Sequence, residues 1–278
     1  MDIISDIATL RERLKSESKI AFVPTMGNLH EGHLSLVEIA RQRAPCVVAS
    51  VFVNRLQFLP HEDFDRYPRT LEQDCALLKQ HGTHIVFAPD EAVLYPQPQT
   101  FFVEPPPIAH ALEGEFRPGF FRGVATVVLK LFNIVQPHIA VFGKKDYQQL
   151  HLVRGMVGAF NLPIEIIAAE TGRAADGLAL SSRNRYLSGV ERAEAARLHQ
   201  SLAHIKTEIE SGNKNFQDIT RAAIASLDSH GWKVDYLVLT HRDTLHPARA
   251  HDRHLVALAA AWLGKTRLID NLEITCPA

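Results

Sequence analysis

Apolar residues in the first two thirds of the chain follow two alternating patterns. Short apolar runs, typical of strands buried on both faces, lie at residues 20–23, 46–53, 83–88, 138–142 and 164–169. Between them lie helical patterns with one apolar face, including residues 70–82, residues 122–135 and a stretch that follows the polar turn GKKD and runs through residue 160. Strands and helices that alternate in this way predict an α/β fold, a Rossmann-like doubly wound parallel sheet of roughly five strands.

The pattern changes after residue 169. Two helical segments, at residues 190–211 and 216–231, come before two strand-like runs, DYLVLTH and HLVALAAAWLG. Helices grouped before strands are typical of an α+β domain. We therefore predict a Rossmann-like domain at residues 1–174 and a smaller C-terminal α+β domain at residues 175–278, joined by a connector at residues 174–188.

Composition narrows the class of protein. The chain has 278 residues, 46% hydrophobic and 22% charged, with a net charge of −1. These values are typical of a globular protein with a substantial core. No basic run with interleaved aromatic residues suggests a nucleic-acid partner, and no apolar stretch is long enough to predict a membrane span.

The cysteines and the N-terminus indicate the compartment. The three cysteines form no C-x-x-C pair, which argues against a disulfide framework and against a thiolate zinc site. The first residues, MDIISDIATL, lack the pattern of a secretory signal. We expect a cytoplasmic protein.

One loop carries the first chemical signal. The segment PTMGNLHEGH, residues 24–33, connects a predicted strand to a predicted helix, so it lies at the carboxyl end of the strand. The first N–H groups of the helix favour an anion, Gly27 and Gly32 allow close approach, and His30 and His33 add side-chain donors. This pattern predicts a phosphate site, and a strand-to-helix turn with two solvated histidines remains the alternative.

Other polar segments stand at corresponding places. VNRLQF and GKKDYQQ each follow a predicted strand, and ligands of doubly wound sheets bind beyond the carboxyl ends of the strands. The connector sequence DGLALSSRNRYLS holds two serines and two arginines within five residues. An ST-turn and a helix cap with solvated arginines would also explain it.

Six segments carry a family resemblance in their order along the chain: PTMGNLHEGH (24–33), SVFVNRLQF (50–58), RYPRTLEQD (66–74), LEGEFRPGFFRGVATVV (112–128), FGKKDYQQL (142–150) and DGLALSSRN (176–184). Together with AAWLGKTRLIDN near the end, they resemble the pantothenate synthetases, which are pantoate–β-alanine ligases of the HxGH nucleotidyltransferase superfamily. The resemblance implies ATP-dependent condensation of (R)-pantoate with β-alanine through a pantoyl adenylate, giving pantothenate, AMP and pyrophosphate, in the biosynthesis of vitamin B5 and coenzyme A. It also implies Mg²⁺, a homodimer through the larger domain, and a C-terminal domain that acts as a lid over ATP.

The resemblance also assigns an ATP site. Its implied members are Met26, Gly27, Asn28, Leu29, His30, Glu31, Gly32, His33, Gly143, Lys144, Lys145, Asp146, Gly172, Leu180, Ser181, Ser182 and Arg183. Catalytic roles fall to His33, His30, Lys145 and Arg183, which would stabilise charge on phosphate oxygens. Asp146 is the expected Mg²⁺ ligand, because hard oxygen ligands suit that ion. A capping role at a helix start is its alternative.

The same resemblance places pantoate against Gln57 and Gln149, with Asn54 assisting. Neutral amides can fix a hydroxy acid by hydrogen bonds without pairing a full positive charge against the carboxylate that must attack. Asp74 is expected near the place where β-alanine reaches the site. Two positions depart from the family pattern: Arg55 replaces a usual proline, and Gly172 replaces a usual branched residue.

Three alternative functions stay open at this point. A related nucleotidyltransferase that makes a different adenylate would keep the HxGH loop but lack the glutamine pair. A metal-dependent hydrolase would use His30, His33 and an aspartate as ligands of a transition metal. A non-catalytic nucleotide-binding module would bind ATP without turning it over.

Overall fold

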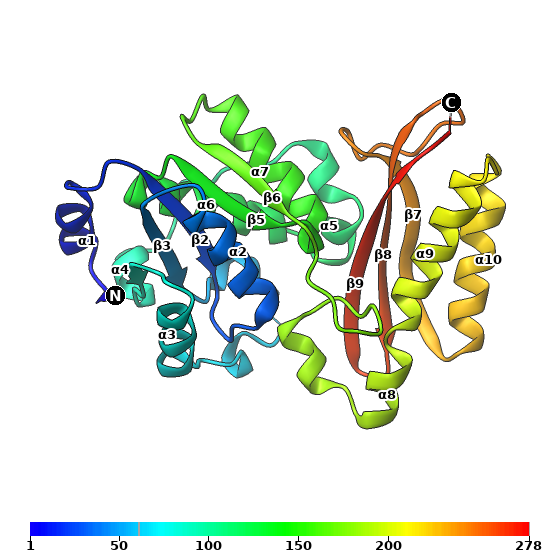
Figure 1. The fold of residues 1–278 in the computed structure, drawn as a ribbon, viewed down its shortest axis with the longest axis horizontal. Helices are drawn as coiled ribbons and strands as arrows, with labels where there is room; N and C mark the ends of the chain where they lie inside the picture. Colours follow the sequence, from blue (N-terminus) through cyan, green and yellow to red (C-terminus); the bar gives the residue numbers. More distant parts are fainter. Residues whose placement is uncertain (61, 278) are drawn as a thin grey trace. The chain divides into compact units, whose positions relative to one another are not determined.

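The computed structural model describes residues 1–60 and 62–277. The chain folds into two compact units (Figure 1). The first contains Met1–Lys144 and Gln149–Glu170, and the second contains Lys145–Gln148 and Thr171–Ala278.

The first unit is built on a six-stranded sheet in the order β1-β4-β3-β2-β5-β6, and every pair of neighbours is parallel. The strands are β1 (Asp2–Ile4), β2 (Ile20–Thr25), β3 (Cys46–Val51), β4 (Ile85–Phe87), β5 (Ile139–Gly143) and β6 (Glu165–Ala169). The predicted α/β class and doubly wound sheet are confirmed. The sequence pattern missed β1, a three-residue edge strand with two exposed residues, because so short a run shows no periodicity.

Helices cover both faces of this sheet (Figure 1). On one face lie α1 (Ile7–Leu14), α6 (Phe120–Val135) and α7 (Tyr147–Ala159). The other face carries α2 (Glu31–Arg41) and α3 (Leu71–Gln80). The short helices α4 (Glu91–Leu94) and α5 (Glu113–Phe116) and the 3-10 turns η1 (Arg55–Gln57), η2 (Phe64–Arg66), η3 (Pro107–His110) and η4 (Lys144–Asp146) complete the unit.

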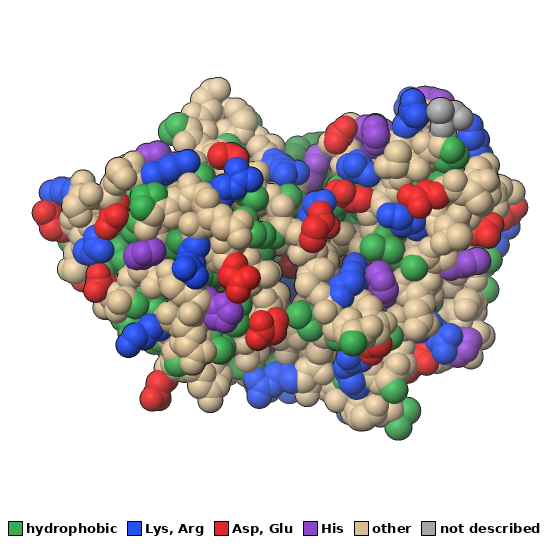
Figure 2. All heavy atoms as spheres, in the orientation of Figure 1, with side chains coloured by type: hydrophobic (Ala, Val, Ile, Leu, Met, Phe, Trp, Pro, Cys, Tyr) green, Lys and Arg blue, Asp and Glu red, His purple; other side chains and the backbone are tan. Residues whose placement is uncertain are grey.

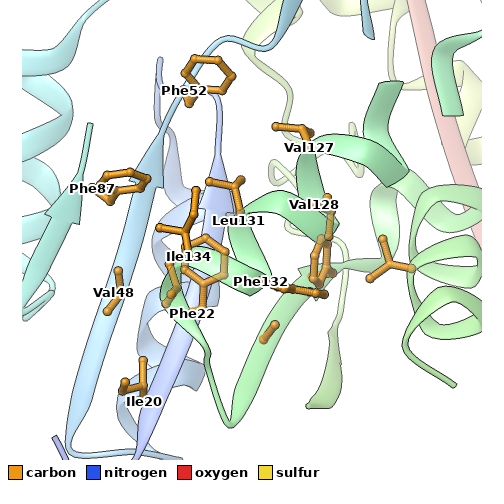
Figure 3. Close-up of a cluster of buried hydrophobic side chains, with 14 of the residues drawn as sticks. Ile20, Phe22, Val48, Phe52, Phe87, Val127, Val128, Leu131, Phe132 and Ile134 are labelled. Carbon is orange, nitrogen blue, oxygen red and sulfur yellow. The ribbon is translucent and has the colours of Figure 1, made fainter. Parts of the chain in front are cut away.

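Burial on both faces explains why the strands are continuously apolar. On the α6 face, Phe22 and Val48 pack with Leu131 and Phe132 (Figure 3). On the opposite face, residues that alternate with these along the same strands, such as Ala21 and Ala49, pack against α2 and α3. Successive side chains of a strand point to opposite faces, so a strand with helices on both sides needs apolar residues at every position.

The strand order creates a switch point in the middle of the sheet. The chain passes from β2 to β3 and β4 on one side of β2, and then crosses to β5 on the other side. In doubly wound folds, ligands bind beyond the carboxyl ends of the strands at such a point. The segments that follow β2, β3 and β5 therefore stand where a ligand is expected.

The second unit has a three-stranded antiparallel sheet in the order β7-β8-β9. Its strands are β7 (Trp232–His241), β8 (His254–Leu263) and β9 (Thr266–Thr275), and its helices are α8 (Gly189–Glu194), α9 (Arg197–Glu210) and α10 (Phe216–Ser229), with the 3-10 turn η5 (Ser182–Tyr186). Leucines and isoleucines of α9 and α10 form a core with the sheet. The predicted smaller α+β domain is confirmed, although β9 was missed.

Charges of both signs are interspersed on the face shown in Figure 2, in keeping with the net charge of −1. Among the described residues, no helix is long and apolar enough to cross a membrane.

Candidate active site

The loop after β2 has an unusual backbone that a buried carboxylate stabilises. Gly27 has φ +83° and Asn28 has φ +52°, so two consecutive residues are left-handed. Asp74, at the start of α3, accepts hydrogen bonds from Asn28 N (2.9 Å) and Leu29 N (2.8 Å) and from the Thr70 hydroxyl (3.0 Å). Its side chain is buried. Both of its oxygens therefore bind the chain itself, and its expected place near the entry of β-alanine stays a prediction.

The two histidines of the loop lie against each other at the start of α2. Their ring centroids are 4.1 Å apart. His30 Nδ1 accepts from Gly32 N (3.1 Å), and His33 Nδ1 accepts from His30 N (3.4 Å), so the pair forms a capping box for the helix. A ring nitrogen that accepts cannot carry the proton of a neutral imidazole. Nε2 is therefore the donor nitrogen of both rings.

Asn54 and Gln57 follow β3, and their side chains touch. Asn54 Nδ2 lies 3.1 Å from Gln57 Oε1, and Gln57 Nε2 lies 3.3 Å from the Met26 sulfur, at the end of β2. Arg117 supports this turn, because its guanidinium donates to the Gln57 carbonyl (3.1 Å) and to Glu62. The structure thus brings Met26, Asn54 and Gln57 together.

Arg55, which replaces a usual proline, does not disturb that turn. It begins η1, and its guanidinium pairs with Glu91 (3.0 Å) and stacks on Phe64 at 3.9 Å from the ring centroid. Its side chain is exposed. The arginine therefore lies outside the Asn54–Gln57 contact.

The two neighbouring lysines that follow β5 differ in their ion-pair partners. Lys144 Nζ pairs with Glu170 at 2.5 Å. Lys145 is half-buried, and no carboxylate of the described residues pairs with its ammonium group. Asp146 is exposed, and Gln149 is half-buried in α7. The cation with no carboxylate partner is therefore the one that the sequence favoured for phosphate contact.

In the second unit, the predicted nucleotide segment begins as a small hairpin. Leu180 N donates to Gly172 O at 2.8 Å, and Arg173 pairs with Ala179 as a β-bridge. Gly177, with φ +94°, lies in the turn, where a Cβ would meet the His199 ring at 2.4 Å. Beyond the hairpin, Ser181 Oγ accepts from Arg183 N (3.2 Å) and caps η5. A backbone hydrogen bond thus joins Gly172 and Leu180, and Ser181 caps the turn that carries Ser182 and Arg183.

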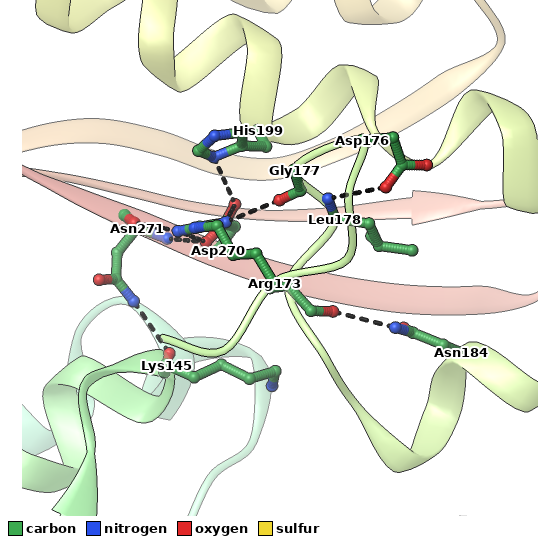
Figure 4. Close-up of polar contacts among 10 residues, drawn as sticks. Lys145, Arg173, Asp176, Gly177, Leu178, Asn184, His199, Asp270 and Asn271 are labelled. Carbon is green, nitrogen blue, oxygen red and sulfur yellow. Dashed lines mark hydrogen bonds and ion pairs between the residues drawn. The ribbon is translucent and has the colours of Figure 1, made fainter. Parts of the chain in front are cut away.

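A buried ion pair fixes this hairpin to β9 (Figure 4). Arg173 donates to both carboxylate oxygens of Asp270 (2.7 and 2.9 Å) and to the Gly177 carbonyl (3.0 Å), while His199 Nδ1 lies 3.4 Å from Asp270. Burial opposes the charged form, yet His199 and the Arg173 guanidinium hold the pKa of Asp270 below its usual range. Next to it, the Asn271 amide donates to Lys145 O at 2.9 Å.

Sequence reasoning missed the supporting residues Arg117, Arg173 and Asp270, and it named Asp74 without foreseeing that this residue supports the loop after β2. Two sequence signals bear on Asp74 and Asp270. The pair Gly27-Asn28 is typical of a left-handed loop, whose backbone N–H groups need buried acceptors, and the adjacent polar residues Asp270 and Asn271 interrupt an apolar run. Neither signal identifies the distant residue that forms the hydrogen bond or ion pair.

Among residues 1–60 and 62–277, no set of three or more His, Cys, Asp or Glu side chains is arranged to hold a metal ion. The hydrolase alternative requires such a set around His30 and His33, whose Nδ1 atoms are instead acceptors for the backbone.

Comparison with known proteins gives one consistent result. The model of the family described as pantoate-beta-alanine ligase matches residues 2–273. Pantothenate synthetase of Nitrosospira multiformis is 68% identical over 275 residues, covering 99% of both chains, and that of Nitrosomonas europaea is 60% identical over 277 residues, covering 100% of both.

Solved structures agree. The crystal structure of pantothenate synthetase from Thermus thermophilus has a TM-score of 0.95 at 45% identity, over 99% of this chain and 100% of that one. Pantoate-beta-alanine ligase from Francisella tularensis, complexed with beta-gamma ATP and beta-alanine, has a TM-score of 0.81 at 34% identity, over 98% and 97%. With its HxGH loop, its glutamine-bearing turn and this match along nearly its whole length, the chain belongs to the pantoate–β-alanine ligase family.

Proposed function

We propose that this chain uses ATP to condense (R)-pantoate with β-alanine, giving pantothenate, AMP and pyrophosphate through a pantoyl adenylate. The observation that carries the proposal is the family match over residues 2–273. The Francisella relative, complexed with beta-gamma ATP and beta-alanine, supports ATP and β-alanine as substrates.

In the first half-reaction, a pantoate carboxylate oxygen attacks the α-phosphorus of ATP. A P–O bond forms as the bond to pyrophosphate breaks, and negative charge develops on the phosphate oxygens. His30 and His33 donate to these oxygens through Nε2, a role that their backbone-bonded Nδ1 atoms support. Lys145 and Arg183 add positive charge, and Arg183 offers a planar fork of donors. Pyrophosphate leaves without a proton, so stabilisation of charge is a sufficient role for His33.

The remaining ATP contacts that we propose come from the loop after β2, the turn after β5 and the hairpin before η5. They are Met26, Gly27, Asn28, Leu29, Glu31, Gly32, Gly143, Lys144, Gly172, Leu180, Ser181 and Ser182. In the second half-reaction, the β-alanine amine attacks the acyl carbon, a C–N bond forms, and AMP leaves with the electrons of the C–O bond as the ammonium proton is released. Gln57 and Gln149 hold pantoate, with Asn54 beside Gln57.

Mg²⁺ would be held at Asp146. This carboxylate is exposed and follows β5 through η4. Mg²⁺ keeps several waters and binds through one or two carboxylates plus substrate phosphates, so a single exposed aspartate fits. The ion would supply neutralisation of phosphate charge.

The decisive experiment is exchange of labelled pyrophosphate into ATP with Mg²⁺ present and β-alanine absent. We expect exchange that depends on pantoate and not on other small hydroxy acids. Exchange supported by a different acid would favour the related nucleotidyltransferase, and ATP binding without exchange would favour the non-catalytic module.

The pantoate site is tested separately with Gln57→Ala. The variant should raise the KM for pantoate more than the KM for ATP, because it removes one donor to the acid and none to the nucleotide. Arg55→Ala, on the same turn but exposed, is the matched control and should leave both KM values unchanged. Equal effects of Gln57→Ala on both substrates would contradict the assignment.

We further propose a homodimer through the first unit and a cytoplasmic location. Exposed phenylalanines of that unit, Phe101, Phe102 and Phe116, support an apolar interface. The three buried, unpaired cysteines suit a reducing compartment. Sedimentation of the protein and of Phe101→Ser tests the dimer, and cell fractionation tests the location.

The lid role of residues 175–278 also stays a prediction. An adenylate hydrolyses if water reaches it, so closure over ATP would protect the intermediate. Small-angle scattering with and without ATP and pantoate tests it. Identical curves would contradict closure.

A further inference from the structure

The hydroxyl of Tyr95 begins a chain of hydrogen bonds that ends at Gln57. Tyr95 follows α4, and its hydroxyl donates to Asn54 Oδ1 at 2.8 Å. Asn54 Nδ2 donates in turn to Gln57 Oε1 at 3.1 Å and to the Gly123 carbonyl at 3.3 Å. Asn54 is 1% exposed, so its amide depends on these partners.

A main-chain carbonyl gives this chain of bonds its direction. The Gly123 oxygen can only accept, so the Asn54 atom facing it must be the NH₂ group. Asn54 Oδ1 then faces Tyr95, whose hydroxyl must donate. Burial raises the pKa of the Tyr95 hydroxyl, which therefore keeps its proton at neutral pH. The second hydrogen of the Asn54 amide points to Gln57, so the Gln57 oxygen faces inward.

The outward atom of Gln57 is consequently its NH₂ group. Within the described residues, Nε2 meets the Met26 sulfur at 3.3 Å and no oxygen acceptor. A thioether is a weak acceptor, so the amide keeps donor capacity for a ligand at the carboxyl end of β2. We propose that Tyr95 is a positioning residue that acts through Asn54 to present the Gln57 NH₂ group as a donor to an acceptor oxygen of the hydroxy acid. The inference rests on the pantoate site proposed at Gln57.

The surrounding structure holds the members of this chain in place. Gly123 lies so close to the turn that a Cβ there would stand 2.1 Å from the Leu56 carbonyl oxygen, and this approach brings the Gly123 carbonyl to Asn54. Lys130 contacts the Tyr95 segment at points other than the hydroxyl: its ammonium donates to the Leu94 carbonyl (2.5 Å) and lies 4.4 Å from the centre of the Tyr95 ring. A phenylalanine at position 95 would keep the ring and lose only the donor.

Tyr95→Phe is therefore the test. Without the hydroxyl, the buried Asn54 oxygen loses its donor, so the Asn54 amide is held less firmly and orients the Gln57 amide less precisely. We expect the KM for pantoate to rise about tenfold while the KM for ATP changes less than about twofold. KM does not depend on the folded fraction, so a partly unfolded preparation still gives the answer.

A double-mutant cycle separates this role from simple loosening of the segment. If Tyr95 acts through Gln57, Tyr95→Phe should change the pantoate KM less than about twofold in the Gln57→Ala background. Lys130→Met, which removes the ammonium contacts of the same segment but not the bond from the Tyr95 hydroxyl to Asn54, is the control and should leave the pantoate KM near wild type.

Each outcome has one meaning. An undiminished Tyr95→Phe effect in the Gln57→Ala background, or an equal rise with Lys130→Met, would overturn the positioning role. A pantoate KM unchanged by Tyr95→Phe, with Gln57→Ala still harmful, would overturn the positioning role alone. A pantoate KM unchanged by Gln57→Ala would instead remove the pantoate site proposed at that residue.

Discussion

Asp74 offers the sharpest test of how the loop after β2 is stabilised. Its carboxylate bonds two successive backbone N–H groups of the loop, Asn28 N and Leu29 N, and the Thr70 hydroxyl. In Asp74→Asn, one oxygen becomes an NH₂ group that faces a backbone N–H, so at least one buried donor loses its acceptor. The remaining bonds lose the assistance of the charge.

The structure sets the size of the effect. A hydrogen bond to a charged group contributes about 1.5–3 kcal/mol, and a neutral one about 1 kcal/mol. Losing one such bond and weakening another should lower the free energy of unfolding by about 2–4 kcal/mol. A loop shifted by about 1 Å would also move His30 and His33 and reduce pyrophosphate exchange by about 10²-fold.

The assays are urea unfolding and pyrophosphate exchange, with Thr70→Val as the control. The control removes the hydroxyl bond but keeps both backbone contacts, so we expect a loss of about 0.5–1.5 kcal/mol and near-normal exchange. An Asp74→Asn variant with wild-type stability and exchange would refute the stabilising role of Asp74 in the loop after β2. Normal exchange with a slow β-alanine step would support a role for Asp74 toward that substrate.

Four further predictions concern other parts of the structure. His33→Ala should keep the fold and reduce pyrophosphate exchange by about 10²–10³-fold, the usual loss for one transition-state donor. Gly123→Ala should destabilise the protein by about 1–3 kcal/mol in urea unfolding, because its Cβ would meet the Leu56 oxygen. Asp270 has a lowered pKa, so its contribution to stability is present above an unfolded pKa of about 3.9 and is lost as the pH falls through the folded value. The difference in unfolding free energy between wild type and Asp270→Asn should therefore shrink below about pH 4. Burial raises the pKa of the Cys46 thiol to about 11, so it should resist thiol reagents at pH 8 until the protein is unfolded.

Each of these four predictions has an outcome that would contradict it. Near-normal exchange in His33→Ala would remove that residue from catalysis, and wild-type stability in Gly123→Ala would mean that the turn after β3 can move. If the difference in unfolding free energy between wild type and Asp270→Asn stayed constant down to pH 3, the lowered pKa of Asp270 would be contradicted. Rapid labelling of native Cys46 would contradict its burial.

The limits of sequence reasoning are visible in the strands that were missed. Five strands were expected from apolar runs in the first domain, and all of them lie in the six-stranded sheet. The edge strand β1 was too short to show a pattern. In β9 the apolar pattern is interrupted at Asp270 and Asn271, which are buried. Asp270 binds Arg173, 97 residues away in the chain, and the Asn271 amide donates to the carbonyl of Lys145, 126 residues away. Periodicity describes burial only when the buried residues are apolar.

The sequence by itself determined the α/β class and the segments that follow β2, β3 and β5, because apolar runs predict the strands and the topology then places their carboxyl ends together. It also indicated a phosphate-type loop from its glycines and histidines. Only the tertiary structure decided which atoms these segments present. The Nε2 donors of the histidines depend on backbone contacts at Nδ1, the loop depends on Asp74, and the donor face of Gln57 depends on Asn54. Such choices come from contacts between residues that are distant in the chain, and no local pattern encodes them.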